Sequence, residues 1–190
     1  MGELSGDIDE EDFQLFVKEQ REPRWVAWLD SIDDQLDRFL IETVPGMPLD
    51  PYTPRGLHLA EETAVAYFPN AEAVHAPQNR AMAEQFGVFL GEVFRRSFEG
   101  SWINVPKYDH WGMGFCPVVR FPFTNMDICV RTFLASAAQD RTTIGWITVW
   151  THAAEIEAAW VRVGRPGRRQ WIQAGWIPPE EYDDQAGFPL

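Results

Sequence analysis

The chain contains 190 residues, of which 45% are hydrophobic and 14% aromatic, and its formal net charge at pH 7 is −13. A chain of this length buries about 70% of the surface of its unfolded state, so it can fold as one domain without a metal ion or disulfide bonds. The strong negative charge argues against general binding to nucleic acids or anionic membranes and favours a basic partner.

The N-terminus is acidic and contains no apolar segment, so we expect residues 1–10 to be flexible and to be neither a secretory signal nor a transit peptide. No run approaches the roughly 18 apolar residues of a membrane-spanning helix. The two cysteines, Cys116 and Cys129, are too few for a disulfide framework. These features predict a cytoplasmic protein without a membrane partner.

The first strong helical signal lies between residues 24 and 43, after a short helix predicted over 12–20 and stopped by Pro23. Apolar residues recur at helical spacing throughout 24–43 and predict one continuous amphipathic helix. Its polar side forms an acidic face, which is either simply solvated or meets a basic partner. The residues of this face are Asp30, Asp33, Asp34 and Asp37.

Four prolines then follow at intervals of three residues between Pro45 and Pro54. In a polyproline II segment their rings would lie along one edge, as in ligands of aromatic-lined grooves. Because helices are predicted on both sides, we favour a rigid connector bound to its own domain. The helix after it is expected over 56–68.

A central helix is predicted over about 78–98, with a broad apolar face and a second stripe of small residues, Ala83, Gly87 and Gly91. Two glycines on one stripe, each costing roughly 1 kcal/mol against alanine, indicate a close approach of another element. Gly100 is placed to end the helix.

Two antiparallel strands are expected next, over 101–105 and 115–123. Prolines at 117 and 122 indicate that the second strand is an edge strand or is bounded by them. Thr124 and Asp127 have the spacing of a capping box and predict a helix from there to about Ala138.

The segment 142–163 carries mixed signals. Its β-branched and aromatic residues favour a strand, whereas its tryptophans keep helical spacing. We expect a helix over 152–162, leave 143–150 open, and expect an irregular C-terminal tail from about 164 to 190. The whole pattern predicts a single α+β domain, with several helices packed on a small antiparallel sheet.

The order of these segments resembles small uncharacterised bacterial α+β domains that are common in actinobacteria. The resemblance covers roughly residues 44–135, and its motifs are Gly91-Glu92 and Gly100-Ser101-Trp102. Some of those proteins are similar to immunity or accessory proteins encoded near polymorphic toxins. The resemblance therefore implies a protein partner, and it brings no active site.

The four histidines and two cysteines of the chain are residue types that bind metal ions. Glu72 and His75 form one E-x-x-H, but helical di-iron sites require two copies and further glutamates. His58, with Glu61 and Glu62 one turn later, equally forms ordinary helix-surface pairs. We predict neither a metal site nor a cofactor.

Asp109, His110 and Cys116 form the one local group with the residue types of nucleophilic catalysis. Cys116 lies in an apolar run before Pro117, where a buried, inert thiol is usual. The chain contains no Gly-x-Ser-x-Gly, P-loop or G-x-G-x-x-G motif. An enzyme is therefore the less favoured interpretation.

Two further segments are candidates for binding. The loop 107–111 carries Tyr108, His110 and Trp111, which are residue types of interface anchors. The alternative is that Trp111 folds back onto the hairpin. The arginine-rich loop from Arg162 to Arg169 is a candidate anion site, through Arg165, Arg168 and Arg169. We favour instead an intramolecular clamp between this loop and an acidic surface.

The leading hypothesis is a non-enzymatic cytoplasmic protein-binding factor, an immunity or chaperone-like protein for a basic toxin or secreted protein. The alternative is a hydrolase or ligand-binding enzyme that uses the Asp109/His110/Cys116 loop or the arginine-rich loop.

Overall fold

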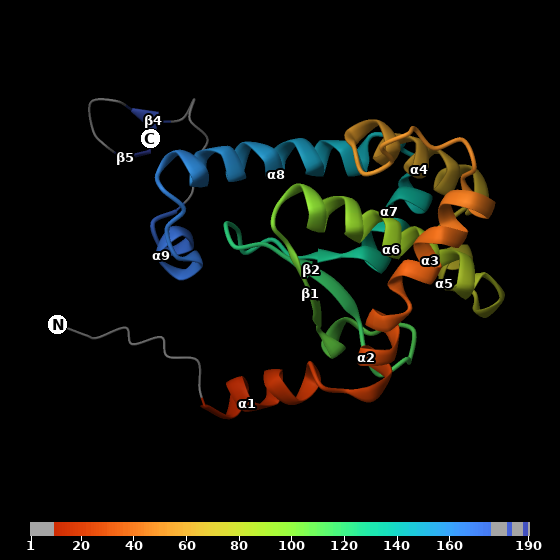
Figure 1. The fold of residues 1–190 in the computed structure, drawn as a ribbon, viewed down its shortest axis with the longest axis horizontal. Coiled ribbons are helices and arrows are strands. Elements are labelled where there is room, and N and C mark those ends of the chain that lie inside the picture. Colours follow the sequence, from red (N-terminus) through yellow and green to blue (C-terminus); the bar gives the residue numbers. More distant parts are fainter. Residues whose placement is uncertain (1–9, 176–181, 184–187, 190) are drawn as a thin grey trace.

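The structure is a computed structural model that describes residues 10–175, 182–183 and 188–189. It confirms the α+β fold, with helices packed on a small antiparallel sheet. Figure 1 shows the sheet and helix α6 in the middle of the molecule, α8 along one side, and α1 and α2 on the other. Apart from Glu10, the N-terminal segment predicted to be flexible lies outside the described residues.

The helices of the first half follow the predicted order, with boundaries shifted by a few residues, except that the short helix over 71–75 was not predicted. They are α1 (Glu10–Glu19), α2 (Pro23–Asp30), α3 (Ile32–Arg38), the π-helical turn η1 (Phe39–Thr43), α4 (Pro54–Tyr67) and α5 (Ala71–His75). After the short 3₁₀ turn η2 (Pro77–Asn79), the central helix α6 spans Arg80–Ser97, close to the predicted 78–98.

The prediction of one continuous helix over 24–43 is wrong, because the chain breaks between α2 and α3 at Ser31. The Ser31 hydroxyl donates to the Trp28 carbonyl at 2.7 Å, and Gln35 Nε2 donates to the same hydroxyl at 2.8 Å. A serine hydroxyl that bonds back to the preceding turn bends a helix. The apolar stripe still faces the core on both sides of the break, with Trp25 and Leu36 buried.

The sheet has the order β1-β2-β3, in which β1 (Ser101–Asn104), β2 (Pro117–Arg120) and β3 (Ile128–Cys129) pair antiparallel. The short turn η3 (Pro106–Tyr108) follows β1. Strand β2 is central, so the prediction of an edge strand is wrong, although Pro117 does begin it. Strand β3 was not predicted.

The helix expected from Thr124 instead begins after β3, as α7 (Val130–Asp140). The Thr124 hydroxyl accepts from the Met126 amide at 3.1 Å and so organises a turn before the strand.

The segment left open by the sequence is helical, because α8 spans Gly145–Arg162. The buried Glu61 carboxylate accepts the Trp146 amide at 3.0 Å and thereby satisfies a free amide at the start of α8. The predicted irregular tail contains α9 (Arg168–Gln173), and the paired strands β4 (Tyr182–Asp183) and β5 (Phe188–Pro189) follow.

The small-residue stripe of α6 lets neighbouring elements approach closely, as predicted. A Cβ atom at Gly91 would overlap the ring of Trp102 on β1, and one at Gly87 would lie 3.3 Å from Val130 Cγ2 on α7. The opposite side of α6 is aromatic, and Phe89 stacks on Phe39 with ring centroids 4.4 Å apart. Helix α6 therefore joins the sheet to the helices around it.

The proline-rich connector is held against its own domain. The Tyr52 ring stacks on the Phe89 ring, with their centroids 5.9 Å apart. The Arg96 guanidinium lies 3.8 Å from the centre of the Tyr52 ring. Thr53 then caps α4 by accepting the Gly56 amide at 3.4 Å. These contacts agree with the predicted rigid connector.

Candidate functional site

The predicted acidic face is present on the outer side of α2 and α3. Asp30, Asp33, Asp34 and Asp37 are all exposed, while the opposite side of these helices packs into the core. Among the described residues, none of the four forms an ion pair. Asp33 contributes to raising the pKa of Arg95, after the larger effect of Glu92.

Two exposed aliphatic side chains lie one helical turn from the ends of this acidic face. Val26 precedes Asp30 by four residues and is 42% exposed, and Ile41 follows Asp37 by four residues and is 71% exposed. Residues four apart on a helix are surface neighbours. The surface therefore combines negative charge with apolar contact area, and we call these six residues the acidic face.

The aromatic loop presents less surface than the sequence indicates. Trp111 is only 9% exposed, so it is not available as an interface anchor. Its indole Nε1 donates to His75 Nδ1 at 2.6 Å. Burial, together with the nearby His110, lowers the pKa of His75, which favours the neutral acceptor form. Tyr108 and His110 remain exposed.

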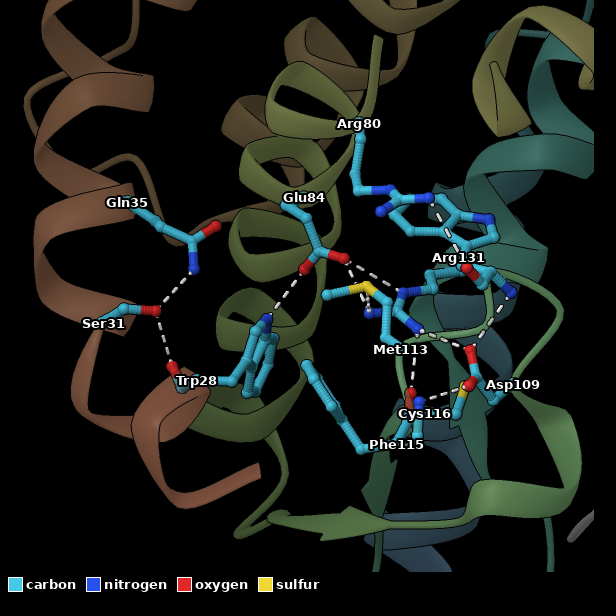
Figure 2. A network of polar contacts seen from close by, with 12 residues as sticks. Trp28, Ser31, Gln35, Arg80, Glu84, Asp109, Met113, Phe115, Cys116 and Arg131 are labelled. Carbon is cyan, nitrogen blue, oxygen red and sulfur yellow. Dashed lines mark hydrogen bonds and ion pairs between the residues drawn. The ribbon is translucent and has the colours of Figure 1, made fainter. Parts of the chain in front are cut away.

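A buried arginine holds this loop against the helices. Arg131 of α7 is 4% exposed and donates to Glu84 of α6 at 2.7 and 3.2 Å (Figure 2). It also donates to the Phe115 carbonyl at 3.1 Å and lies 3.6 Å from Asp109. Its guanidinium lies 4.4 Å from the centre of the Trp111 ring.

The same glutamate also binds the acidic helices to the core. Trp28 Nε1 of α2 donates to Glu84 Oε2 at 2.7 Å, on the opposite carboxylate oxygen from Arg131 (Figure 2). Sequence reasoning missed both Glu84 and Arg131. Trp28 lies 56 residues before Glu84, and Arg131 lies 47 residues after it. From the sequence alone, a charged residue in an amphipathic helix is expected to be exposed to solvent.

The residues proposed for the alternative, enzymatic interpretation are not arranged as a catalytic triad. Asp109 accepts the amides of Trp111 and Gly114 at 3.1 and 2.7 Å and faces Arg131. Cys116 is buried, whereas His110 is exposed. Within the described part of the chain, no hydrogen bond or ion pair joins any two of Asp109, His110 and Cys116.

The two cysteines contact each other. Cys116 Sγ lies 3.5 Å from Cys129 Sγ, and the Thr132 hydroxyl donates to Cys129 Sγ at 3.2 Å. The hydrogen bond from Cys116 lowers the pKa of Cys129 to about 6, against the effect of burial. The same contact, together with burial, raises the pKa of Cys116.

The arginine-rich loop forms the intramolecular clamp that we favoured. Arg165 pairs with Glu99, and Arg168 donates to the carbonyls of Phe121 and Thr124, both at 3.1 Å. Arg168 also lies 4.0 Å from Asp127. The candidate anion-binding residues Arg165 and Arg168 are thus engaged within the chain.

The histidines of the two candidate metal-binding groups, His58 and His75, have other partners. His75 accepts from Trp111, and His58 Nδ1 lies 2.8 Å from the Thr143 carbonyl. Within the described ranges, no three histidine, cysteine, aspartate or glutamate side chains are grouped so that they could hold a metal ion.

Comparison of the chain with protein-family models, curated proteins and solved structures found no match. None of the described helices is both long and apolar enough to span a membrane.

Proposed function

We propose that this protein is a non-enzymatic binding factor that receives a basic surface of a partner protein on its acidic face. The observation that carries the proposal is that Asp30, Asp33, Asp34 and Asp37 are exposed without an ion pair in the described part of the chain. A negative surface of this kind steers a basic protein during encounter and disfavours acidic competitors.

Charge alone supplies little of the affinity in this proposal. Exposed ion pairs typically contribute about 0.2–1 kcal/mol each. Val26 and Ile41 provide the apolar surface that would be buried against the partner. The partner surface expected from this combination is basic at its centre, with aliphatic or aromatic side chains at its ends.

The proposal extends to the kind of partner and to the compartment. A basic toxin or secreted protein that must be neutralised or held before export would fit this surface, which makes the protein immunity-like or chaperone-like. The free thiols of Cys116 and Cys129 fit a reducing cytoplasm. The resemblance of residues 44–135 to immunity-like actinobacterial domains supports the same role.

The test compares two variants with the same change in net charge. In the face variant, all four aspartates of the acidic face are changed to asparagine. In the control variant, four exposed acidic residues on other elements are changed to their amides: Glu62, Glu72, Asp140 and Glu155. Each protein is immobilised, exposed to a lysate of the native host at about 150 mM salt to screen distant charges, and the retained proteins are identified.

We expect the wild type and the control variant to retain the same basic protein and the face variant to lose it. Retention by all three proteins would refute the acidic face as the binding surface. Equal loss from both variants would show a general charge effect, and recovery of background proteins alone would oppose a binding role altogether.

A further inference from the structure

The sheet brings the two cysteines together on one face. Cys129 of β3 is opposite Val118 of β2, and Cys116 lies two residues before Val118, so the three side chains point to the same side. Ile103 of β1 is opposite Val118 from the other neighbouring strand. The chain thus places its two thiols within contact distance, at 3.5 Å, without a disulfide bond between them.

The two thiols differ in environment. Cys116 is fully buried, and its amide donates to the Asn104 side chain at 3.0 Å, which fixes its backbone. Cys129 is only partly buried and directly precedes α7. The Thr132 hydroxyl, one turn into α7, donates to Cys129 Sγ. Cys129 is therefore the less buried of the two thiols and has a hydrogen-bond donor, whereas Cys116 is enclosed by the protein.

Oxidation of a thiol to a disulfide requires a reactive thiol and a second thiol close to it, and this arrangement has both. A thiolate reacts with peroxide when it is accessible and stabilised, and a second thiol nearby converts the product into a disulfide. A disulfide has an S–S distance of about 2.05 Å, so the two sulfurs must approach by roughly 1.5 Å. Strand β3, which holds Cys129, has only two residues and follows the irregular segment 124–127, which makes such a shift feasible.

We propose that Cys129 is a peroxide-reactive thiol and that Cys116 resolves its oxidised form into an intramolecular disulfide. In the first step the Cys129 thiolate attacks one oxygen of hydrogen peroxide. The O–O bond breaks, Cys129 becomes a sulfenic acid, and the departing hydroxide takes a proton from solvent to form water.

In the second step Cys116 Sγ attacks Cys129 Sγ. The S–O bond breaks, and the departing hydroxide takes the Cys116 thiol proton and leaves as water. The dithiol is oxidised by two electrons, the peroxide is reduced to two molecules of water, and a dithiol reductant restores the thiols.

The local charges are compatible with this order of events. The hydrogen bond from Cys116, and then that from Thr132, lower the pKa of Cys129 to about 6, so its thiolate is present at neutral pH. Arg131 favours, and Asp109 disfavours, a negative charge on Cys116. Phe16 of α1 packs against the same cluster and restricts access to small oxidants.

The experiment uses the full chain, reduced and then treated with hydrogen peroxide in small excess. We expect the intact mass to fall by that of two hydrogen atoms, a linked peptide containing Cys116 and Cys129, and reversal by dithiothreitol. Unchanged thiols, a link between two molecules, or direct conversion of Cys129 to sulfinic acid would overturn the proposal.

Variants separate the two roles. With Cys116→Ala, Cys129 should stop at the sulfenic acid and be trapped by dimedone, whereas Cys129→Ala should leave Cys116 unmodified. Circular dichroism verifies that each variant is folded. Modification of Cys116 in the folded Cys129→Ala variant would overturn the assignment.

A third variant keeps both thiols and tests the activation of Cys129. Thr132→Val removes the hydroxyl donor and should slow alkylation of Cys129 by iodoacetamide roughly tenfold when the rate is measured at about pH 5, below the pKa of Cys129, since a hydrogen bond to a charged group changes the acid dissociation constant about tenfold. Thr151→Val, at an exposed threonine of α8, is the matched control and should leave the rate unchanged. An equal rate in wild type and Thr132→Val would show that Cys129 is not the activated thiol.

Discussion

The ring of Trp102 occupies the space that a side chain at residue 91 would need. Trp102 is held there from two sides, because its Nε1 donates to Glu92 at 2.8 Å and its ring meets the Trp28 ring edge-on at 5.1 Å. The glycine of α6 and the tryptophan of β1 therefore specify how the central helix is placed on the sheet.

Gly91→Ala should destabilise the protein by about 1–3 kcal/mol, the usual cost of overpacking, because its methyl group would displace the Trp102 ring. Gly87→Ala is the control on the same stripe. Its methyl would meet only Val130 at 3.3 Å, and the gain in helix propensity offsets the tight contact. Urea denaturation measures both free energies of unfolding. Equal effects in the two variants would refute the packing of Trp102 on Gly91.

The pair Glu84 and Arg131 should behave as a buried ion pair. Arg131→Met alone should cost about 3–5 kcal/mol, because it leaves the Glu84 carboxylate without its main partner. Adding Glu84→Gln to Arg131→Met should recover part of that loss. A double-mutant cycle from urea denaturation gives the coupling free energy. Simple additivity of the two single effects would contradict the direct interaction.

Glu92 should contribute to acid sensitivity. Burial alone would raise the pKa of its carboxyl, but hydrogen bonds from Arg95, Arg96 and Trp102 outweigh it and lower the pKa below the ordinary 4.5. Its stabilising effect is therefore complete above pH 4.5 and is lost as the pH falls through the folded-state pKa. Glu92→Gln should flatten the dependence of unfolding free energy on pH between about 5 and 3.

The pKa of Glu61 is shifted in the opposite direction to that of Glu92, so its contribution to stability changes with pH in the opposite sense. Burial raises the pKa of its carboxyl, despite the amides of Trp146 and Gly145. Its contribution is complete below pH 4.5 and declines as the pH rises through the raised value. If Glu92→Gln and Glu61→Gln changed the acid dependence in the same direction, the assigned causes of these shifts would be wrong.

Trp111→Phe should keep the ring beside Arg131 and remove the hydrogen bond to His75. We expect a loss of about 1 kcal/mol, the typical net contribution of one hydrogen bond. The pKa of His75, followed by NMR titration, should change in the variant. Tyr108→Phe, at an exposed position of the same loop, should have no measurable effect on stability.

The sequence allowed prediction of elements whose apolar residues repeat regularly. Helix α6 and the outward position of Asp30 and Asp37 follow directly from helical spacing. The break at Ser31 did not, because the apolar stripe continues across it and only a side-chain hydrogen bond reveals the bend. Strand β3 has two residues, which is too short for any periodic pattern.

The contacts that shape the candidate sites depend on chain segments far apart. The sequence predicts that Cys116 is a buried, inert thiol. Its contact with Cys129 depends on the pairing of β2 with β3, which the sequence did not predict. Likewise, the buried position of Arg131 depends on its ion pair with Glu84, which lies 47 residues earlier. Local spacing carries no information about such pairs.

Glu84 uses its two oxygens for two different parts of the molecule, Trp28 on one side and Arg131 on the other. Arg131 lies in the first turn of α7, two residues after Cys129. A partner that moved α2 would therefore disturb the anchor of α7, and thermodynamic linkage requires the reverse as well. Occupancy of the acidic helices and the oxidation state of the cysteines are thus expected to report on each other.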